Sequence, residues 1–255
     1  MKRRPLLVAN WKMYKTVEAS KSFARTLSQS LQEWWNSERV ELVIAPTALA
    51  LAAMRRQLGD FGVQLGAQNL ELGTEAALTG GLSGYLLHEA GADWAIVGHS
   101  ERRQHFGETD AMVADKFEAA AAAGLLPIVC VGETEAERDQ GRTEAVVLEQ
   151  LERILEKPFA NGLTIAYEPV WAIGSGRVAK TEEANQISLR IRTLVAQAWP
   201  ENAESVRILY GGSVNPDNLH GFLAQSAIDG ALIGGASLSA DGLTAMIRVA
   251  ETAKP

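Results

Sequence analysis

The sequence predicts an α/β protein that forms a closed (β/α)8 barrel of parallel strands, and three observations support this fold class. Eight short, largely apolar runs are typical of strands that are buried on both faces of a parallel sheet. Amphipathic segments of helix length lie between these runs, which indicates helices that cover the sheet. The 255 residues suffice for eight such units. The expected strands are residues 6–10, 41–45, 63–68, 94–98, 127–131, 163–167, 207–210 and 230–233.

Local signals mark several of the expected helices. One face of the first helix recurs at helical spacing, at Val17, Ser20, Ala24, Leu27 and Leu31. Thr134 and Glu137 have the spacing of a capping box, and Asn215-Pro216 is typical of an N-cap followed by proline at the first helical position. A doubly wound open sheet is the alternative architecture. It would favour a glycine-rich phosphate turn after an early strand, whereas the first strand ends in Ala9-Asn10-Trp11-Lys12.

One domain over residues 1–255 is expected, because no spacer rich in proline, serine or glycine and no abrupt change of charge divides the chain. Hydrophobic residues make up 47% of the sequence, which is enough for a large core. The net charge of -7 opposes a long groove for nucleic acid but allows a local site for an anion. We therefore expect a small-molecule partner and no nucleic acid.

The single cysteine, Cys130, cannot form an intramolecular disulfide, which fits a reducing compartment. A lone buried cysteine behaves as a small apolar group, so Cys130 is expected mainly to pack. No spacing typical of a metal site is present, and no metal is expected. The apolar run 6–9 after the basic residues 2–4 is too short for a signal-peptide core, and no stretch reaches the length of a membrane span. We expect a cytoplasmic protein without a membrane partner.

The stretch after the sixth expected strand delivers one carboxylate and then becomes a loop. Glu168 stands at the end of the strand, because Pro169 withdraws a backbone donor and limits further pairing. Gly174 and Gly176 give the loop conformational freedom, whereas Trp171 gives it a large side chain that can dock. This composition predicts a hinged lid. Taken alone, the stretch also fits an ordinary loop with a solvated glutamate.

Polar and small residues follow many of the expected strands at their carboxyl ends, where the active groups of such barrels gather. A base, an imidazole, an ammonium group and small-residue turns can together abstract a proton beside a carbonyl and hold a phosphate. Metal-dependent hydrolysis fits less well, because no cluster of metal ligands emerges. The residues are Asn10, Lys12, Gln68, Asn69, His99, Ser100, Glu101, Glu133, Glu168, Ser213, Gly234 and Gly235.

Five separate motifs follow one another along nearly the whole chain. They are Asn10-Trp11-Lys12-Met13, Gly98-His99-Ser100-Glu101-Arg102-Arg103, residues 166–176, Tyr210-Gly211-Gly212-Ser213-Val214 and Gly234-Gly235-Ala236-Ser237-Leu238. Together, in this order, they resemble the triosephosphate isomerase family. The resemblance implies a TIM barrel enzyme of glycolysis and gluconeogenesis. It would interconvert dihydroxyacetone phosphate and D-glyceraldehyde 3-phosphate through an enediol or enediolate, without a cofactor.

The resemblance also implies a role for each catalytic residue. Glu168 would be the base that moves a proton between two substrate carbons under a closed lid, residues 169–180. His99 would polarise the substrate carbonyl as a neutral donor. Lys12 would supply positive charge for the enediolate and the phosphate, and Asn10 would position Lys12 and line the site.

The substrate phosphate would be held by backbone N–H groups rather than by side chains. The resemblance implies Gly174, Ser213, Gly234 and Gly235 as these positions, and a short helix beginning near Gly235 would add its dipole. The glycine pairs 211–212 and 234–235 also fit plain left-handed turns that leave strands, and both interpretations can hold at once.

Further residues are expected to support the site. Ser100 and Glu101 would begin a helical turn directly after His99. Tyr210 and Ser213 would latch the closed lid.

The lid of this chain departs from the family pattern at three positions. Ser175, Arg177 and Val178 stand where threonine, lysine and threonine are common. The two glycines of the lid are kept, so the departures concern the rate of closure. Glu133 would contact Trp171 in one position of the lid.

The resemblance further implies a homodimer. Gln68, Asn69 and Thr79 belong to a loop that in this family crosses to another subunit. Leu78 and Gly81 replace the aromatic residue and the glutamate that are common in that loop, and these changes concern the strength of the interface.

Two other functions share some of these features. Another phosphate-binding barrel, such as a sugar-phosphate epimerase or an amino-acid pathway isomerase, would keep the glycine turns but use other acids and bases. A catalytically silent barrel could serve as a scaffold, because a fold does not fix a function. The combination of Lys12, His99 and Glu168 favours the isomerase over both.

Overall fold

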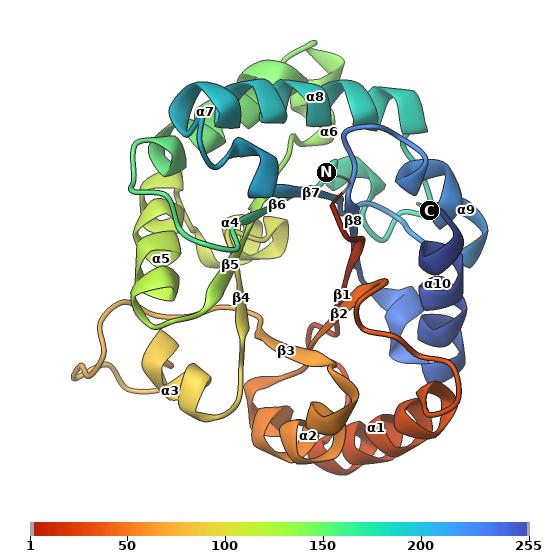
Figure 1. The fold of residues 1–255 in the computed structure, drawn as a ribbon. Coiled ribbons are helices and arrows are strands. Elements are labelled where there is room, and N and C mark those ends of the chain that lie inside the picture. Colours follow the sequence, from red (N-terminus) through yellow and green to blue (C-terminus); the bar gives the residue numbers. More distant parts are fainter. Residues whose placement is uncertain (1–2, 254–255) are drawn as a thin grey trace.

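The computed structural model describes residues 3–253, whose strands form one closed barrel (Figure 1). The strands are β1 (Leu6–Asn10), β2 (Glu41–Ala45), β3 (Gln64–Ala67), β4 (Trp94–Val97), β5 (Leu126–Val131), β6 (Thr164–Tyr167), β7 (Arg207–Tyr210) and β8 (Gly230–Ile233). All neighbours are parallel, and β1 closes the barrel by pairing with both β2 and β8. The predicted (β/α)8 barrel is confirmed, and the doubly wound open sheet is wrong. Residues 1–2 and 254–255 of the expected domain lie outside the described residues.

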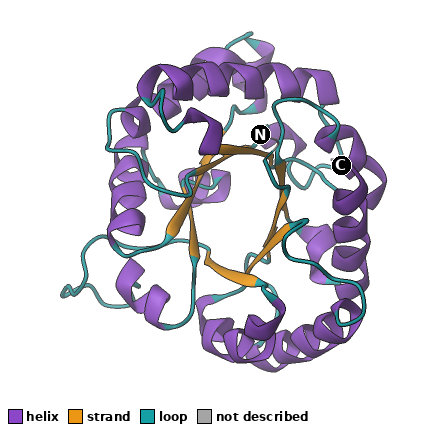
Figure 2. Cartoon of the chain, in the orientation of Figure 1, coloured by secondary structure: helices purple, strands orange, loops and turns teal. Residues whose placement is uncertain are grey.

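Helices surround the strands as an outer ring (Figure 2). The α-helices are α1 (Val17–Leu31), α2 (Leu51–Leu58), α3 (Gly84–Glu89), α4 (Ser100–Phe106), α5 (Asp110–Ala122), α6 (Glu135–Asp139), α7 (Thr143–Leu155), α8 (Thr181–Ala198), α9 (Pro216–Leu223) and α10 (Ala240–Ala253). The shorter 3-10 helices are η1 (Ala48–Ala50), η2 (Gly59–Phe61), η3 (Val170–Ala172), η4 (Ala203–Ser205) and η5 (Gly235–Leu238). Within residues 3–253, no helix has the length and apolar character that crossing a membrane requires.

The helix starts that the sequence marks are present in the structure. Thr134 and Glu137 form a capping box at α6: the Glu137 N–H donates to Thr134 Oγ1, and the Glu137 carboxylate accepts from Thr134 N at 2.8 Å. Asn215 caps α9 by accepting from Asn218 N at 3.1 Å, and Pro216 takes the first helical position. Both predictions are confirmed.

Several strand ends differ from the prediction by one residue. Gly98 has a φ of +69°, a left-handed conformation that does not continue a strand, so β4 ends before it. Leu163 N donates to Ala160 O at 3.1 Å within a turn, so β6 begins after Leu163. β3 lacks one expected residue at each end, and β5 begins one residue earlier, at Leu126. These shifts leave the order of the elements unchanged.

Alternation along the strands separates two apolar layers. Leu7 and Ala9 of β1 belong to the large core between the barrel and the helices, whereas Leu6 and Val8 point into the barrel. The inner cluster consists of Leu6, Val8, Val43, Ala45, Trp94, Ile96, Ile128, Cys130, Ala166, Leu209 and Leu232. Cys130 therefore packs inside the barrel, and burial raises the pKa of its thiol well above the ordinary value.

The amino ends of the strands carry buried charges that pair with one another. Glu41, at the start of β2, accepts from Arg4 Nη2 and from Arg207 Nη1, each at 2.5 Å. Burial alone would raise the pKa of Glu41, but the two guanidinium groups hold it below its ordinary value of 4.5. Asp229, directly before β8, likewise pairs with Arg192. Fixed ion pairs thus occupy this end of the barrel.

Candidate active site

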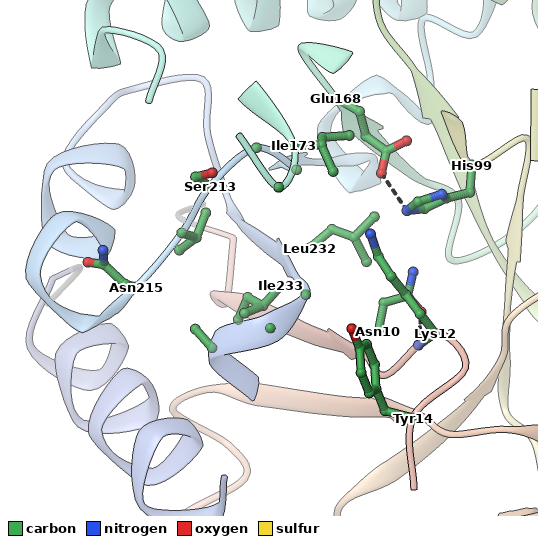
Figure 3. A pocket seen from close by; sticks show the side chains of 17 residues that line it. Asn10, Lys12, Tyr14, His99, Glu168, Ile173, Ser213, Asn215, Leu232 and Ile233 are labelled. Carbon is green, nitrogen blue, oxygen red and sulfur yellow. Dashed lines mark hydrogen bonds and ion pairs between the residues drawn. The ribbon is translucent and has the colours of Figure 1, made fainter. Parts of the chain in front are cut away.

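A cavity of about 340 Å³ lies at the carboxyl ends of the strands, opposite the paired charges (Figure 3). Its walls come from the ends of β1, β4, β6, β7 and β8 and from the loops that follow them. Ser100, Glu101 and Tyr210 lie behind this lining rather than in it. The predicted site residues that line the cavity are Asn10, Lys12, His99, Glu168, Gly174, Ser213, Gly234 and Gly235.

Glu168 lies directly after β6 and is buried, with 2% of its surface exposed. Its backbone N–H donates to Val131 O at 2.7 Å, which continues the pairing with β5. Its carboxylate accepts from Ser100 N at 3.0 Å and approaches His99 Nε2 at 3.1 Å (Figure 3). A Cβ atom on Gly211 would lie 2.8 Å from Glu168 Cγ, so glycine leaves room for this side chain. The alternative of a solvated glutamate is therefore wrong.

His99 caps α4 and presents one ring nitrogen to the cavity. Its Nδ1 accepts from Glu101 N at 3.2 Å, so this nitrogen carries no proton. The ring proton then belongs to Nε2, which faces Glu168 Oε1 at 3.1 Å. In this arrangement the imidazole is neutral and can donate from Nε2 to an oxygen atom in the cavity.

Lys12 follows β1 with a left-handed backbone, φ +50°, which costs energy for a residue with a side chain. Two side chains stabilise this bend. Asn10 Oδ1 accepts from Lys12 N at 3.0 Å, and Gln68 Nε2 donates to Lys12 O at 2.9 Å. The ammonium group reaches Glu101 Oε1 at 2.6 Å, so the bend directs positive charge toward the side of the cavity that carries His99.

The glycines of the pairs 211–212 and 234–235 allow close packing or leave open space, and they are not needed for a left-handed backbone. None of Gly211, Gly212, Gly234 and Gly235 has a left-handed backbone, so their interpretation as left-handed turns is wrong. A Cβ atom on Gly212 would lie 2.2 Å from the hydroxyl oxygen of Tyr210. At Gly235, where η5 begins, nothing lies within 4 Å of such an atom. The first turn of η5 therefore borders open space at the cavity edge.

The lid, residues 169–180, is fixed at its start by one buried carboxylate. Trp171 Nε1 donates to Glu133 Oε1 at 2.8 Å, and the Tyr167 hydroxyl donates to Glu133 Oε2 at 3.1 Å. Burial raises the pKa of Glu133, although both donors favour its charged form. The contact between Trp171 and Glu133 is the one that the sequence predicts for one position of the lid.

The remainder of the lid is held at its far end and is exposed between the two anchors. Ala179 N donates to the hydroxyl oxygen of Tyr210 at 3.3 Å. Ser213 Oγ donates to Ala172 O, in η3, at 2.6 Å. The sequence predicts Tyr210 and Ser213 as latches of the closed lid, whereas here both hold the ends of the lid while the residues between them stay exposed. Residues 174–178, here called the lid tip, are all exposed to solvent.

Part of the cavity wall is apolar and was missed by reasoning from the sequence. Ile173, Val214 and Leu232 line the cavity beside the polar groups. Leu232 lies in β8 and belongs to the inner cluster, a position that the alternation of that strand could have indicated. Ile173 lies in the lid, where no periodic pattern gives the direction of a side chain.

A carboxylate, a neutral imidazole and an ammonium group thus meet around one cavity beside the start of η5. Such groups can remove a proton next to a carbonyl, donate to the oxyanion that forms and attract an anion. Within residues 3–253, no three side chains of His, Cys, Asp or Glu are grouped as metal ligands would be.

Comparisons with known proteins point to one family. The family model described as triosephosphate isomerase matches residues 5–250. A triosephosphate isomerase of Dictyoglomus turgidum is 44% identical over 250 residues, which cover 96% of this chain and 99% of that protein. Another, of Chloroflexus aurantiacus, is 47% identical over 243 residues, covering 93% of this chain and 96% of that protein.

A solved structure agrees with these matches. The crystal structure of triosephosphate isomerase from Bartonella henselae has a TM-score of 0.88 to this chain at 35% identity, and the match covers 97% of this chain and 99% of that one. A shared barrel alone would leave function open, because many unrelated enzymes use this fold. The family model and the full-length relatives remove that ambiguity. The chain therefore belongs to the triosephosphate isomerase family.

Proposed function

We propose that the cavity at the carboxyl end of the barrel is the active site and that Glu168, His99 and Lys12 carry the reaction. The family's activity, which the full-length relatives establish for this chain, interconverts dihydroxyacetone phosphate and D-glyceraldehyde 3-phosphate. One observation supports the assignment above all others. Glu168 Oε1 and His99 Nε2 lie 3.1 Å apart inside a cavity that Lys12 also lines.

Each residue has one task in the proposed mechanism. Glu168 removes a proton from the carbon beside the substrate carbonyl, and the electron pair of that bond forms the enediolate. His99 donates its Nε2 hydrogen to the carbonyl oxygen as negative charge develops, and Lys12 stabilises that charge. The former carbonyl oxygen takes up a proton and the hydroxyl on the adjacent carbon gives one up, with His99 Nε2 carrying the proton between the two oxygens. Return of the other proton from Glu168 to the former carbonyl carbon completes the exchange between ketone and aldehyde.

The contact between Glu168 and His99 describes the site before substrate binds. A substrate oxygen would take the place that Glu168 Oε1 now holds beside His99 Nε2. The carboxylate would also leave Ser100 N. The Glu168 carboxylate makes both of these contacts, so one rotation of its side chain frees the carboxylate and the imidazole together.

The phosphate group of the substrate is assigned to the side of the cavity formed by β7 and β8. Backbone N–H groups at the first turn of η5 are free of helical partners and attract an anion, beginning at Gly235. Gly234 and Ser213 line the same side. Closure of the lid would bring Gly174 toward the phosphate and exclude water, which strengthens the attraction of Lys12 for the substrate.

A homodimer is a further part of the proposal. A second cavity of about 500 Å³ adjoins the active site, and its lining includes Met13, Tyr14 and Phe106, which are 96%, 57% and 65% exposed. Leu78, in the loop assigned to the interface, is also exposed. Contact between two copies would remove this apolar surface from water. Sedimentation velocity should show a dimer, and an active monomer at all concentrations would contradict the proposal.

Two simpler properties complete the proposal. The chain is one domain over residues 1–255, because no spacer divides the sequence. It acts in the cytoplasm, because a chain whose single cysteine, Cys130, cannot form an intramolecular disulfide fits a reducing compartment.

A coupled assay on the two triose phosphates tests the catalytic assignment through Glu168→Asp. The shorter side chain retracts the carboxylate by about one bond length, and a misplacement of about 1 Å can cost roughly 10²-fold in rate. We expect kcat to fall by at least that factor while circular dichroism and thermal unfolding stay unchanged. Turnover close to wild type would contradict Glu168 as the base. A folded wild-type protein without turnover would favour the catalytically silent barrel.

A further inference from the structure

One ion pair connects the lid tip to the body of the barrel. Arg177 Nη1 lies 2.5 Å from Glu135 Oε1, and Glu135 is the first residue of α6. The same guanidinium donates from Nη2 to Trp171 O at 3.0 Å, inside the lid. The bonds of Ser175 also stay inside the lid. Within the described part of the chain, the pair of Arg177 and Glu135 is the one ion pair from the lid tip to another element, and Asp139 of the same helix adds a smaller attraction for Arg177.

The location of Glu135 opposes movement of the lid tip over the cavity. Glu135 follows β5, whereas the residues assigned to the phosphate, Ser213 and Gly235, follow β7 and β8. β5 and β7 lie on opposite sides of β6, from which the lid extends. A lid tip that moves toward β7 and β8 moves away from Glu135. The ion pair can therefore form while the lid tip lies near α6, but not once the lid tip has moved over the cavity.

We propose that the ion pair of Arg177 and Glu135 is a latch that holds the lid open and sets how readily it closes over substrate. The inference rests on the proposed function, because it takes the lid to close over a bound phosphate. Neither residue lines the cavity, so both are positioning residues. A stronger latch requires the substrate to supply more binding energy for closure, and a weaker latch requires less.

The surroundings of the pair limit its strength and make it sensitive to salt. The Arg177 side chain is 49% exposed and the Glu135 side chain is 56% exposed. Pairs this exposed shift an equilibrium by about two- to fivefold, and salt weakens them. Their hydrogen bond raises the pKa of Arg177 and lowers the pKa of Glu135, so both stay charged at neutral pH.

The variant Glu135→Gln tests the latch, and Glu144→Gln is its matched control. Glu144 pairs with Arg190 at the same 2.5 Å, with side chains 55% and 54% exposed, on α7 and α8 rather than on the lid. Each variant removes one negative charge and one exposed pair. For each, the inhibition constant of inorganic phosphate and the KM and kcat for the triose phosphates are measured at low and high KCl.

The latch predicts a specific pattern among these constants. Glu135→Gln should lower the phosphate inhibition constant and KM by about two- to fivefold at low salt, because the lid closes more readily. Its kcat should stay equal or fall, because product leaves only when the lid opens. Glu144→Gln should match the wild type. In high KCl the wild-type pair is screened, so the difference between Glu135→Gln and wild type should disappear.

A double-mutant cycle with Arg177→Met separates the latch from the other hydrogen bond of Arg177. Glu135→Gln should have no effect on the phosphate inhibition constant in the Arg177→Met background. Equal constants for Glu135→Gln and Glu144→Gln, or an equal effect in both backgrounds, would overturn the latch and leave the proposed function intact. A wild-type enzyme that phosphate does not inhibit would overturn the proposed phosphate site, and the latch with it.

Discussion

The two ends of the barrel hold their buried glutamates in opposite ways. At the amino end, Glu41 lies between the guanidinium groups of Arg4 and Arg207, each at 2.5 Å. At the carboxyl end, Glu168 contacts the Ser100 N–H, the imidazole of His99 and the thiol of Cys130, and none of these is a guanidinium or ammonium group. Opposite full charges in a buried place are costly to separate, whereas neutral donors can be exchanged for a substrate.

The backbone at the carboxyl end is strained as well. Lys12 keeps a left-handed conformation at the carboxyl end, supported by Asn10 and Gln68. Strain of this kind persists only where surrounding contacts determine it, and it gathers at functional sites. One barrel thus uses buried charge for stability at one end and keeps it available for chemistry at the other. Variants at the two ends can therefore be compared by their activity and by their stability.

A large effect should follow from removing the cation at the carboxyl end. Lys12→Met keeps an unbranched side chain of similar length but removes the ammonium group. We expect kcat/KM to fall by roughly 10²–10³-fold, the cost of losing one electrostatic contact to a developing oxyanion. Stability should change little, because the pair of Lys12 with Glu101 is partly exposed. If Lys12→Met keeps the wild-type kcat/KM in the coupled assay, Lys12 does not supply the charge that stabilises the oxyanion.

An intermediate effect should follow from loosening the far anchor of the lid. Burial raises the pKa of Tyr210 to about 12, so its hydroxyl stays neutral while it accepts from Ala179 N. Tyr210→Phe removes this acceptor but keeps the ring, which stacks on Phe222. We expect kcat/KM to fall by about three- to tenfold, the worth of one hydrogen bond, with the thermal midpoint nearly unchanged. Unchanged kinetics would show that this anchor does not guide the lid.

The smallest effect should be an acid titration of the amino end. The pKa of Glu41 in the folded protein lies below its ordinary value of 4.5, so the unfolded chain binds this proton more tightly. The stabilisation is fully present above pH 4.5 and is lost as the pH falls through the folded pKa. The free energy of unfolding in urea should therefore fall below pH 4.5 in the wild type, and it should fall less steeply in Glu41→Gln. Equal pH dependence in the two proteins would contradict this account.

Much of the fold could be predicted because its signals are local. The capping pairs at Thr134 and Asn215 act within one helical turn, so a short window of sequence contains all their partners. The strand runs likewise depend on their own apolar residues. The run of small and apolar residues continues to Gly98 and predicts that the strand includes it, whereas the left-handed φ of Gly98 is set by the turn into α4.

The candidate site could be predicted as a set of residues but not as a geometry. His99 and Glu168 stand at strand ends, which the barrel rule selects. Their 3.1 Å contact depends on closure of the barrel, which brings β4 and β6 to one cavity. The support of Lys12 by Gln68 and the pair of Arg177 with Glu135 also join distant segments. No local pattern encodes such contacts.

One identical substitution at the two ends tests the central comparison most directly. Glu168→Gln and Glu41→Gln remove one buried charge each, and kcat and the free energy of unfolding in urea are measured for both. Glu168→Gln should lower kcat by roughly 10²–10⁴-fold and leave unfolding near wild type. Glu41→Gln should keep kcat and lower the free energy of unfolding by about 3 kcal/mol, because two guanidinium groups lose their partner. Turnover retained in Glu168→Gln, or equal losses of activity and stability in both variants, would contradict the account.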